Sequence, residues 1–245
     1  MKYCSLTDKG LIRERNEDSY AVVENDNSDI LYVVCDGIGG NKAGDIASAE
    51  VVKTVSKLFK TTKSFKSSKD VKKFILNAIN EANNVILDLG NKFFEFYGMG
   101  TTITGVLITG KNAYSFNVGD SRVYGIKDQK IKQLTVDDTL VNFLVEQGKI
   151  TKEEAKTHPK RSHLIKAIGI SQYIDVPVNK LDFYDYFIIC SDGLYSMVDD
   201  EKLLKIITSK DKLEKKTEKL VHEALMNGGF DNITVINVEC NDWKQ

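Results

Sequence analysis

Four aspartates stand at the ends of apolar runs in this 245-residue chain: Asp36, Asp120, Asp192 and Asp231. Apolar runs of this length, bounded by Gly and Asp, are typical of buried strands, so we expect these carboxylates to meet at the rim of a packed sheet. At an effective dielectric near 20, two unit charges about 4 Å apart repel each other by roughly 4 kcal/mol. Cations between them would offset that repulsion, so the pattern predicts a metal site.

The donor types indicate which metals would bind. Carboxylate, carbonyl and water oxygens suit Mg²⁺ or Mn²⁺, whereas zinc or copper would call for His or Cys, and the three histidines show no such spacing. Asp36-Gly37 and Asp192-Gly193, taken alone, are also typical of hairpin turns. The glycines after Asp36 allow more backbone freedom than a two-residue turn needs, and they would let a cation reach the carbonyl of Gly37.

Two divalent ions bridged by a carboxylate could activate a water for attack on phosphorus. The favoured reaction is therefore hydrolysis of a phosphate ester. Arg13 lies in a charged N-terminal segment, and its guanidinium could bind phosphate oxygens bidentately. The alternative for Arg13 is an ordinary surface residue.

Composition and length limit the possible domain organisation, partners and location of the chain. We expect one domain over residues 1–245, because no Pro/Gly/Ser-rich linker interrupts the chain. The net charge of −1 does not favour a nucleic-acid binder, and no apolar stretch is long enough for a membrane span. Without a signal-peptide pattern or a Cys-x-x-Cys pair, the chain is predicted to be cytoplasmic, with free thiols.

The predicted elements form an α+β layered domain with antiparallel sheets and outer helices. Helices are expected over residues 43–59 and 71–89, the second from apolar residues at i, i+3 and i+4 spacing. Strands are expected over 21–24, 31–36, 101–109, 113–118, 122–126, 174–181 and 187–191. Residues 137–165 are expected to form two short helices and to act as a flap near the cleft.

Seven motifs in register, spanning essentially the whole chain, resemble those of the metal-dependent protein phosphatases of the PPM or 2C family. They are Arg13-x-x-Asn16-Glu17-Asp18, Cys35-Asp36-Gly37-Ile38-Gly39-Gly40, Gly98-Met99-Gly100-Thr101-Thr102, Val118-Gly119-Asp120-Ser121-Arg122-x-Tyr124, His158-Pro159, Ser191-Asp192-Gly193-Leu194 and Gly228-Gly229-x-Asp231-Asn232-Ile233-Thr234. Any one of them is weak evidence, but the ordered set is specific. The chain looks like the compact bacterial form of these enzymes.

The resemblance implies a four-layer sandwich, in which two central antiparallel sheets are flanked by helix pairs and carry a small helical flap. It implies hydrolysis of phosphoserine and phosphothreonine in proteins with Mn²⁺ or Mg²⁺, as two ions and a weaker third. The implied partners are phosphorylated proteins, including a Hanks-type Ser/Thr kinase whose action the chain would oppose; a monomer is expected.

The resemblance also assigns roles to individual residues. By these roles, Asp36 bridges two ions and Gly37 offers its carbonyl as a ligand, while Asp192 and Asp231 complete the coordination shell of the first ion. Asp18 acts through water, and Asp120 with Asp192 holds the third ion. Arg13 binds the phosphate. Glu17 could replace Asp18. Asn232 is expected to orient Asp231.

Two departures from the family pattern concern the acid and the flap. Many eukaryotic members carry His where Ile38 stands, so a histidine acid is missing at that position. The flap motif usually begins Asp-His-Ser and here reads Asp137-Asp138-Thr139, which leaves substrate selection by the flap open.

Three other functions compete with this interpretation. One is a hydrolase of small phosphoesters, another is a non-catalytic phosphoprotein-binding regulator on the same fold, and the third is a two-metal nuclease, which would need a basic groove and aromatic platforms. Residues 53–73 also contain eight lysines and one acid, Asp70. This segment is either a solvated face or a docking patch for an acidic partner.

Overall fold

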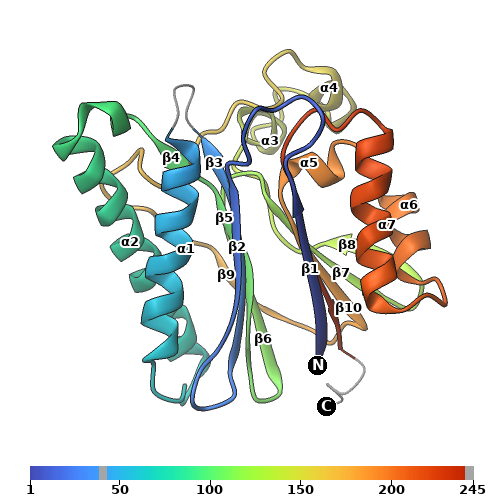
Figure 1. The fold of residues 1–245 in the computed structure, drawn as a ribbon, viewed down its shortest axis with the longest axis horizontal. Coiled ribbons are helices and arrows are strands. Elements are labelled where there is room, and N and C mark those ends of the chain that lie inside the picture. The colour runs from blue at the N-terminus through green and yellow to red at the C-terminus, as the bar shows by residue number, and fades with distance from the viewer. Residues whose placement is uncertain (39–42, 241–245) are drawn as a thin grey trace.

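Two antiparallel sheets lie face to face in the computed structural model, and helices cover their outer faces (Figure 1). The structure describes residues 1–38 and 43–240. Gly39 and Gly40, which belong to the glycine-rich motif after Asp36, lie outside the described residues. The layered arrangement confirms the predicted α+β sandwich.

The first sheet has the strand order β1-β11-β10-β7-β8. Its strands are β1 (Lys2–Asp8), β7 (Arg122–Lys127), β8 (Lys130–Gln133), β10 (Tyr186–Cys190) and β11 (Ile233–Glu239). The second sheet has the order β2-β3-β5-β6-β9, and β4 pairs with β3. Its strands are β2 (Asp18–Glu24), β3 (Ile30–Ile38), β4 (Gly100–Thr101), β5 (Ile103–Thr109), β6 (Asn112–Val118) and β9 (Val178–Leu181).

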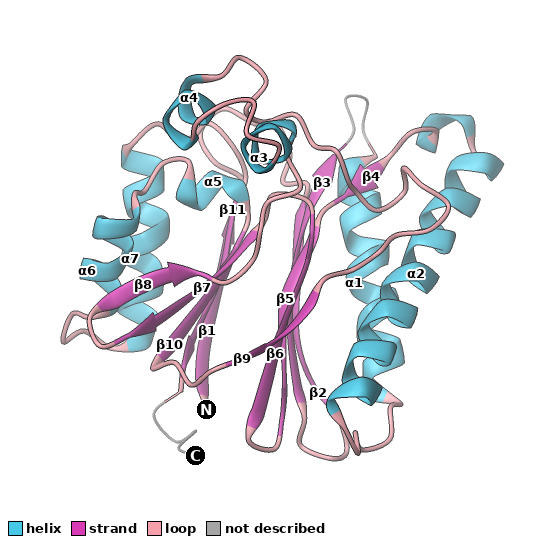
Figure 2. Ribbon diagram, turned by 180° about the vertical axis from the view of Figure 1, so that it is seen from behind, coloured by secondary structure: helices cyan, strands magenta, loops and turns pink. Residues whose placement is uncertain are grey.

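Each sheet carries a pair of helices on its outer face (Figure 2). The second sheet is covered by α1 (Gly44–Lys60) and α2 (Ser68–Lys92), and the first by α6 (Asp200–Ile207) and α7 (Leu213–Met226). The remaining helices are η1 (Phe94–Phe96), α3 (Leu140–Glu146), α4 (Lys152–Thr157) and α5 (Asp192–Tyr195). The Ser67 hydroxyl caps α2 by accepting a hydrogen bond from the Asp70 amide, which explains why this helix begins before the predicted residue 71.

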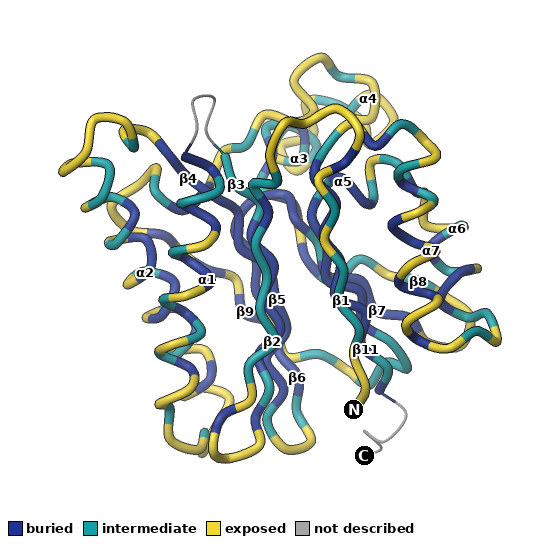
Figure 3. The backbone as a smooth tube through the Cα atoms, viewed as in Figure 1, coloured by how far each residue is buried: buried dark blue, intermediate teal, exposed yellow. Residues whose placement is uncertain are grey.

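The alternation of side chains along β3 explains why its apolar run is continuous. Leu31, Val33 and Cys35 face α1 and α2, whereas Tyr32 and Val34 face the other sheet. Successive side chains of a strand point to opposite faces, and here both faces are covered. Figure 3 shows the result, with buried strands in the middle and exposed residues on the outer helix faces and loops.

Two predicted strands differ from the structure. Residues 174–181 form a strand only over Val178–Leu181. The Asn80 side chain accepts from the Ile174 amide at 3.0 Å and donates to the Ile174 carbonyl at 2.9 Å, so these groups are not available for a ladder, and Pro177 has no amide to offer. The predicted strand 101–109 is interrupted at Thr102, next to the carboxylate site.

Three further predictions concern the flap, the cysteines and the membrane. The flap region contains the two short helices expected there, α3 and α4, followed by the His158-Pro159 turn. All four cysteines are free thiols, as predicted. Within residues 1–38 and 43–240, no helix has both the length and the apolar character needed to cross a bilayer.

Candidate active site

A cleft of about 390 Å³ is lined by residues at strand ends of both sheets and by residues of the flap. Figure 1 shows the flap helices α3 and α4 above these ends of the two sheets. The lining residues are Arg13, Glu17, Asp36, Gly37, Ile38, Thr102, Asp120, Ser162, Leu164, Asp192, Asp231 and Asn232. The structure therefore brings Arg13 and five of the six predicted metal ligands into one cavity, and the sixth, Asp18, lies directly behind Asp36.

Asp18 and Asp36 are direct neighbours across the β2–β3 pair. Residues opposite each other on antiparallel strands present their side chains to the same face. Asp18 is buried, and its Oδ2 accepts a hydrogen bond from the Ser191 hydroxyl at 2.7 Å. Ser191 in turn accepts from the Thr234 amide at 3.0 Å, so this serine joins the carboxylate of one sheet to a strand of the other.

Thr102 fixes the backbone around Asp36. The Thr102 hydroxyl accepts from the Asp36 amide at 2.9 Å, and the Thr102 amide donates to the Asp36 carbonyl at 2.8 Å. The hydrogen bond to the Thr102 hydroxyl takes the place of a backbone hydrogen bond between β3 and its neighbour. The neighbouring strand is therefore interrupted at Thr102, and β4 and β5 are separate strands. Sequence reasoning did not select Thr102 or Ser191 as site residues, although both stand inside the motifs quoted for the family.

The other three aspartates come from the edges of strands. Asp120 lies in the turn between β6 and β7, Asp192 is the first residue of α5 just after β10, and Asp231 precedes β11. Because β10 and β11 are paired neighbours, Asp192 and Asp231 emerge at the same edge of the first sheet. Asp36 reaches the cleft from β3 of the second sheet, and Asp120 lies in the connection between the two sheets.

Burial and crowding favour the protonated form of these acids. Burial, with the charge of neighbouring carboxylates, raises the pKa of Asp18 and of Asp120 to about 7 and that of Asp192 to about 6. The pKa of Asp36 is raised well above its usual range for the same two reasons. Several carboxyl groups removed from water in one cleft therefore lack counter-charge.

The donor set fits divalent cations. All the candidate ligands are oxygens, and buried Oδ1 atoms of Asp18 and Asp192 have no hydrogen-bond partner in the described structure. Unpartnered buried carboxylate oxygens are costly unless a cation or a donor reaches them. In residues 1–38 and 43–240, no three His, Cys, Asp or Glu side chains are grouped so that they could hold a metal ion as they stand.

Arg13 lies at the mouth of the cleft. Its Nη2 donates to Asp231 Oδ2 at 2.7 Å, and its side chain remains 54% exposed. Asp192 and Asp36 add further attraction and, with Asp231, raise the pKa of the Arg13 guanidinium. A half-exposed guanidinium beside a partly exposed carboxylate can receive an anion that enters from solvent.

Asn232 contacts the Asp231 carboxylate and also holds a loop. Its backbone amide donates to Asp231 Oδ1 at 2.9 Å, in keeping with the expectation that it orients this carboxylate. Its side chain accepts from the Glu17 amide at 2.8 Å and donates to the carbonyls of Lys9 and Arg15 at 2.9 and 2.8 Å. The side chain of Asn232 thus holds the loop that carries Arg13, a role that was not predicted.

Glu17 and Asp18 occupy different positions. Glu17 lines the cleft and lies against Gly44, while Asp18 is buried behind Asp36. Burial, followed by the charge of Asp45, raises the pKa of Glu17.

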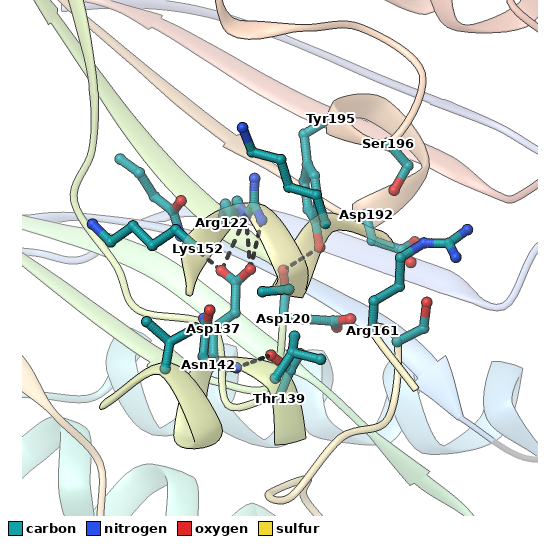
Figure 4. Close-up of a pocket in the computed structure, with 16 residues that line it drawn as sticks. Asp120, Arg122, Asp137, Thr139, Asn142, Lys152, Arg161, Asp192, Tyr195 and Ser196 are labelled. Atoms are coloured by element: carbon teal, nitrogen blue, oxygen red, sulfur yellow. Dashed lines mark hydrogen bonds and ion pairs between the residues drawn. The ribbon is translucent and has the colours of Figure 1, made fainter. Parts of the chain in front are cut away.

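A second cavity of about 400 Å³ continues the cleft beneath the flap (Figure 4). It shares Asp120, Ser162 and Asp192 with the first cavity. Lys152, Lys156 and Arg161 line it from the flap side. No pattern in the sequence singled out Ser162 or Leu164 of the flap as lining residues.

The acidic residues at the start of the flap, Asp137 and Asp138, bind the flap to neighbouring elements. Asp137 is buried and accepts from Arg122 Nε at 3.0 Å and from Arg122 Nη2 at 2.6 Å (Figure 4). Asp138 accepts from the Gly119 amide at 3.1 Å. The Arg122 guanidinium stacks 3.5 Å above the Tyr195 ring, and the Tyr195 hydroxyl donates to the Asp120 carbonyl at 2.8 Å. The base of the flap is therefore joined to the turn that carries Asp120.

Comparison with known proteins gives a consistent result. The family model described as "Protein phosphatase 2C" matches residues 13–226. The chain is 35% identical over 237 residues to the serine/threonine phosphatase stp of Listeria welshimeri. The alignment covers 96% of this chain and 94% of that protein. It is 33% identical over 245 residues to the phosphatase PstP of Mycobacterium tuberculosis, covering 99% of this chain and 46% of PstP.

Solved structures agree in fold. The serine/threonine phosphatase Stp1 from Staphylococcus aureus matches with a TM-score of 0.91 at 34% identity, over 97% of this chain and 94% of that one. The PPM Ser-Thr phosphatase MsPP from Mycobacterium smegmatis, solved in complex with cacodylate, matches with a TM-score of 0.83 at 32% identity, over 98% of each chain. The chain belongs to the protein phosphatase 2C family.

Proposed function

We propose that this protein is a metal-dependent protein phosphatase that hydrolyses phosphoserine and phosphothreonine. The observation that carries the proposal is the cleft in which Asp36, Asp120, Asp192 and Asp231 lie beside Arg13. Names of relatives support the substrate class, since the Listeria and Mycobacterium proteins are called serine/threonine phosphatases.

The carboxylates would hold Mn²⁺ or Mg²⁺, as two ions and a weaker third. Asp36 would bridge the two ions, with the Gly37 carbonyl, Asp192 and Asp231 as further ligands. Asp18 would act through water, a role that Glu17 could also take. Asp120 with Asp192 would hold the third ion. Such ions, when bound, supply positive charge and lower the pKa of water that is to attack phosphorus.

Arg13 would bind the phosphate of the substrate and exchange its contact with Asp231 for the phosphate oxygens. Ser191 and Thr102 would keep Asp18 and Asp36 in place through the hydrogen bonds described above. Ile38 lines the cleft, and none of the described lining residues is a histidine, so the proton for the leaving group would come from another source.

The biological setting is part of the same proposal. The substrates would be phosphorylated proteins, including a Ser/Thr kinase of the Hanks type. We propose that the chain acts as a monomer in the cytoplasm and binds no nucleic acid.

A comparison of substrates tests the proposal. Phosphate release would be measured with Mn²⁺ from a phosphothreonine peptide, a nucleotide and a sugar phosphate at equal concentrations. A protein phosphatase hydrolyses the peptide most efficiently. Preference for a nucleotide or sugar phosphate would indicate a hydrolase of small phosphoesters, and binding of the peptide without turnover would indicate a non-catalytic regulator.

A further inference from the structure

Three large apolar side chains are exposed at the mouth of the cleft. Leu11 is 66% exposed, Ile12 is 64% exposed and Phe230 is 58% exposed. Ile12 directly precedes Arg13, and Phe230 directly precedes Asp231. Single apolar residues on a surface are ordinary, but a group of them beside a binding site is typical of an interaction surface.

Leu11 and Phe230 belong to one surface because both pack against the neighbouring glycines Gly228 and Gly229. The Leu11 amide donates to the Gly229 carbonyl at 2.8 Å, and a methyl group added to Gly229 would lie 3.0 Å from Leu11 Cγ. A methyl group added to Gly228 would collide with the Phe230 ring. We call Leu11, Ile12 and Phe230 the apolar rim.

The apolar rim is held in place by the site itself. The Asn232 side chain donates to the carbonyls of Lys9 and Arg15, which lie on either side of Leu11 and Ile12. The Gly10 amide donates to Asp8 Oδ1 at 2.8 Å and closes the start of the loop. A surface that is already ordered binds a partner with a smaller entropic cost.

We infer that the apolar rim binds apolar side chains that flank the phosphorylated residue of a protein substrate. This inference rests on the proposed function. When the phosphate lies against Arg13, the substrate chain must leave the cleft over neighbouring surface. Ile12 and Phe230 directly adjoin Arg13 and Asp231 in the chain, so substrate residues close to the phosphorylated one would meet the apolar rim.

The two ends of the cleft favour different occupants. The end under the flap is lined by charged side chains of both signs, which suit polar groups: Lys152, Lys156, Arg161, Asp120, Asp137 and Asp192. The end at Arg13 and Asp231 continues into the apolar rim, which offers apolar area. A substrate chain that crosses the cleft would therefore place apolar residues on the apolar rim.

Matched phosphothreonine peptides test this inference. One series carries Leu and Phe within three residues on the N-terminal side, a second carries them on the C-terminal side, and a third carries Ser and Gln instead. For the preferred apolar series, Phe230→Ser and Leu11→Ser should each raise KM about fivefold to tenfold, as expected for loss of partly buried apolar area. KM for the polar peptide and for an aryl phosphate should stay within twofold.

The control is Phe94→Ser, since Phe94 is 92% exposed and lies in η1, outside the cleft lining. It should leave all substrates unchanged, and thermal unfolding should show that every variant is folded. Affinity for the same peptides with a non-hydrolysable phosphonate in place of the phosphate gives a second readout that needs no turnover.

Any other result contradicts the inference that the apolar rim binds the substrate. If peptides are hydrolysed but apolar and polar series respond alike to Phe230→Ser, the proposed function stands and the apolar rim does not. If neither peptide nor phosphonate binds while small phosphoesters are hydrolysed, both fail. If the wild type is a dimer that Phe230→Ser dissociates, the apolar rim contacts a second copy instead.

Discussion

At the scale of single residues, charge explains the arrangement around the cleft. The Asp231 carboxylate is paired with Arg13 at 2.7 Å, whereas Asp18 and Asp192 each keep a buried oxygen with no hydrogen-bond partner among the described residues. Burial and like charges raise the pKa of Asp18 to about 7 and that of Asp192 to about 6, so these two acids keep their protons to a higher pH than exposed carboxylates do, and a bound cation would favour their ionised forms. The same oxygen atoms that are costly without a cation are those that a cation would use.

The first prediction concerns Arg13. Arg13→Ala removes a charge-assisted hydrogen bond of about 1.5–3 kcal/mol to the phosphate, so KM for a phosphothreonine peptide should rise at least tenfold. If Arg13 binds ground and transition states alike, kcat should fall by a smaller factor. Steady-state kinetics of the Ala and Lys variants measure both constants. A loss confined to kcat would assign Arg13 a role in the chemical step.

The second prediction concerns protonation of the leaving group. With Ile38 in the cleft in place of a histidine, we propose that Asp120, which would help to hold a weaker third ion, supports delivery of this proton. Asp120→Ala should then slow phosphothreonine peptides by on the order of 100-fold, as for loss of a general acid. An aryl phosphate, whose phenolate leaves without a proton, should be slowed much less. Equal losses on both substrates would contradict this role.

At the scale of elements, the base of the flap is fixed by a buried ion pair that was not expected. Sequence reasoning left the role of Asp137-Asp138-Thr139 open, because Asp138 and Thr139 replace the usual His and Ser. In the structure Asp137 pairs with Arg122, and Asp138 accepts from the Gly119 amide beside Asp120. The flap and the turn that carries Asp120 are therefore one connected unit.

The third prediction measures that connection. Asp137→Ala leaves the Arg122 guanidinium, 23% exposed, without its partner and should lower the free energy of unfolding by roughly 2–4 kcal/mol. The matched control is Glu153→Ala on α4, which breaks an exposed ion pair with Lys156 and should cost under about 0.5 kcal/mol. Denaturant titrations give both values. Similar small losses in the two variants would show that the flap base does not depend on Asp137.

Apolar periodicity predicted the elements that face a core on one side or both. The helices around 43–59 and 71–89 and the strands 31–36, 113–118, 122–126 and 187–191 are all present. Periodicity could not reveal that Asn80 takes the backbone partners of Ile174, because that contact joins residues distant in sequence. Strand β8 and helices α5 to α7 were not selected individually, although the family resemblance implied helices on both sheets.

The candidate site followed from residue types at strand ends, and its details did not. Asp36, Asp120, Asp192 and Asp231 were selected because each bounds an apolar run, and the fold brings all four to one cleft. The contacts of Asn232 and Ser191 depend on how two sheets meet, which no local pattern records.

At the scale of the whole molecule, the cleft and the lysine-rich segment lie at opposite ends. Lys53, Lys57, Lys60, Lys63, Lys66, Lys69, Lys72 and Lys73 are all exposed. They follow α1 away from the cleft, cross the connection to α2 and continue into the start of that helix (Figure 1). A short peptide in the cleft cannot reach this segment, but a whole protein could.

The fourth prediction tests the lysine-rich segment as a docking patch. Changing Lys60, Lys63 and Lys66 to Glu should weaken hydrolysis of an acidic whole phosphoprotein severalfold at low salt, less at high salt, and leave short peptides unaffected. The same three changes to Gln separate loss of charge from repulsion. Unchanged rates on whole proteins would identify the segment as a solvated face.

The most direct test of the account is metal-dependent phosphate release from a phosphothreonine peptide by the wild type and by Asp36→Asn. We expect no release after chelation, full recovery when Mn²⁺ is restored, and loss of at least 100-fold in Asp36→Asn at every Mn²⁺ concentration, because the carboxylate that we propose bridges the ions is gone. Thermal unfolding should show that Asp36→Asn is folded. An undiminished rate in chelator, or substantial activity of Asp36→Asn, would contradict the central claim that this cleft is a metal-dependent phosphatase site.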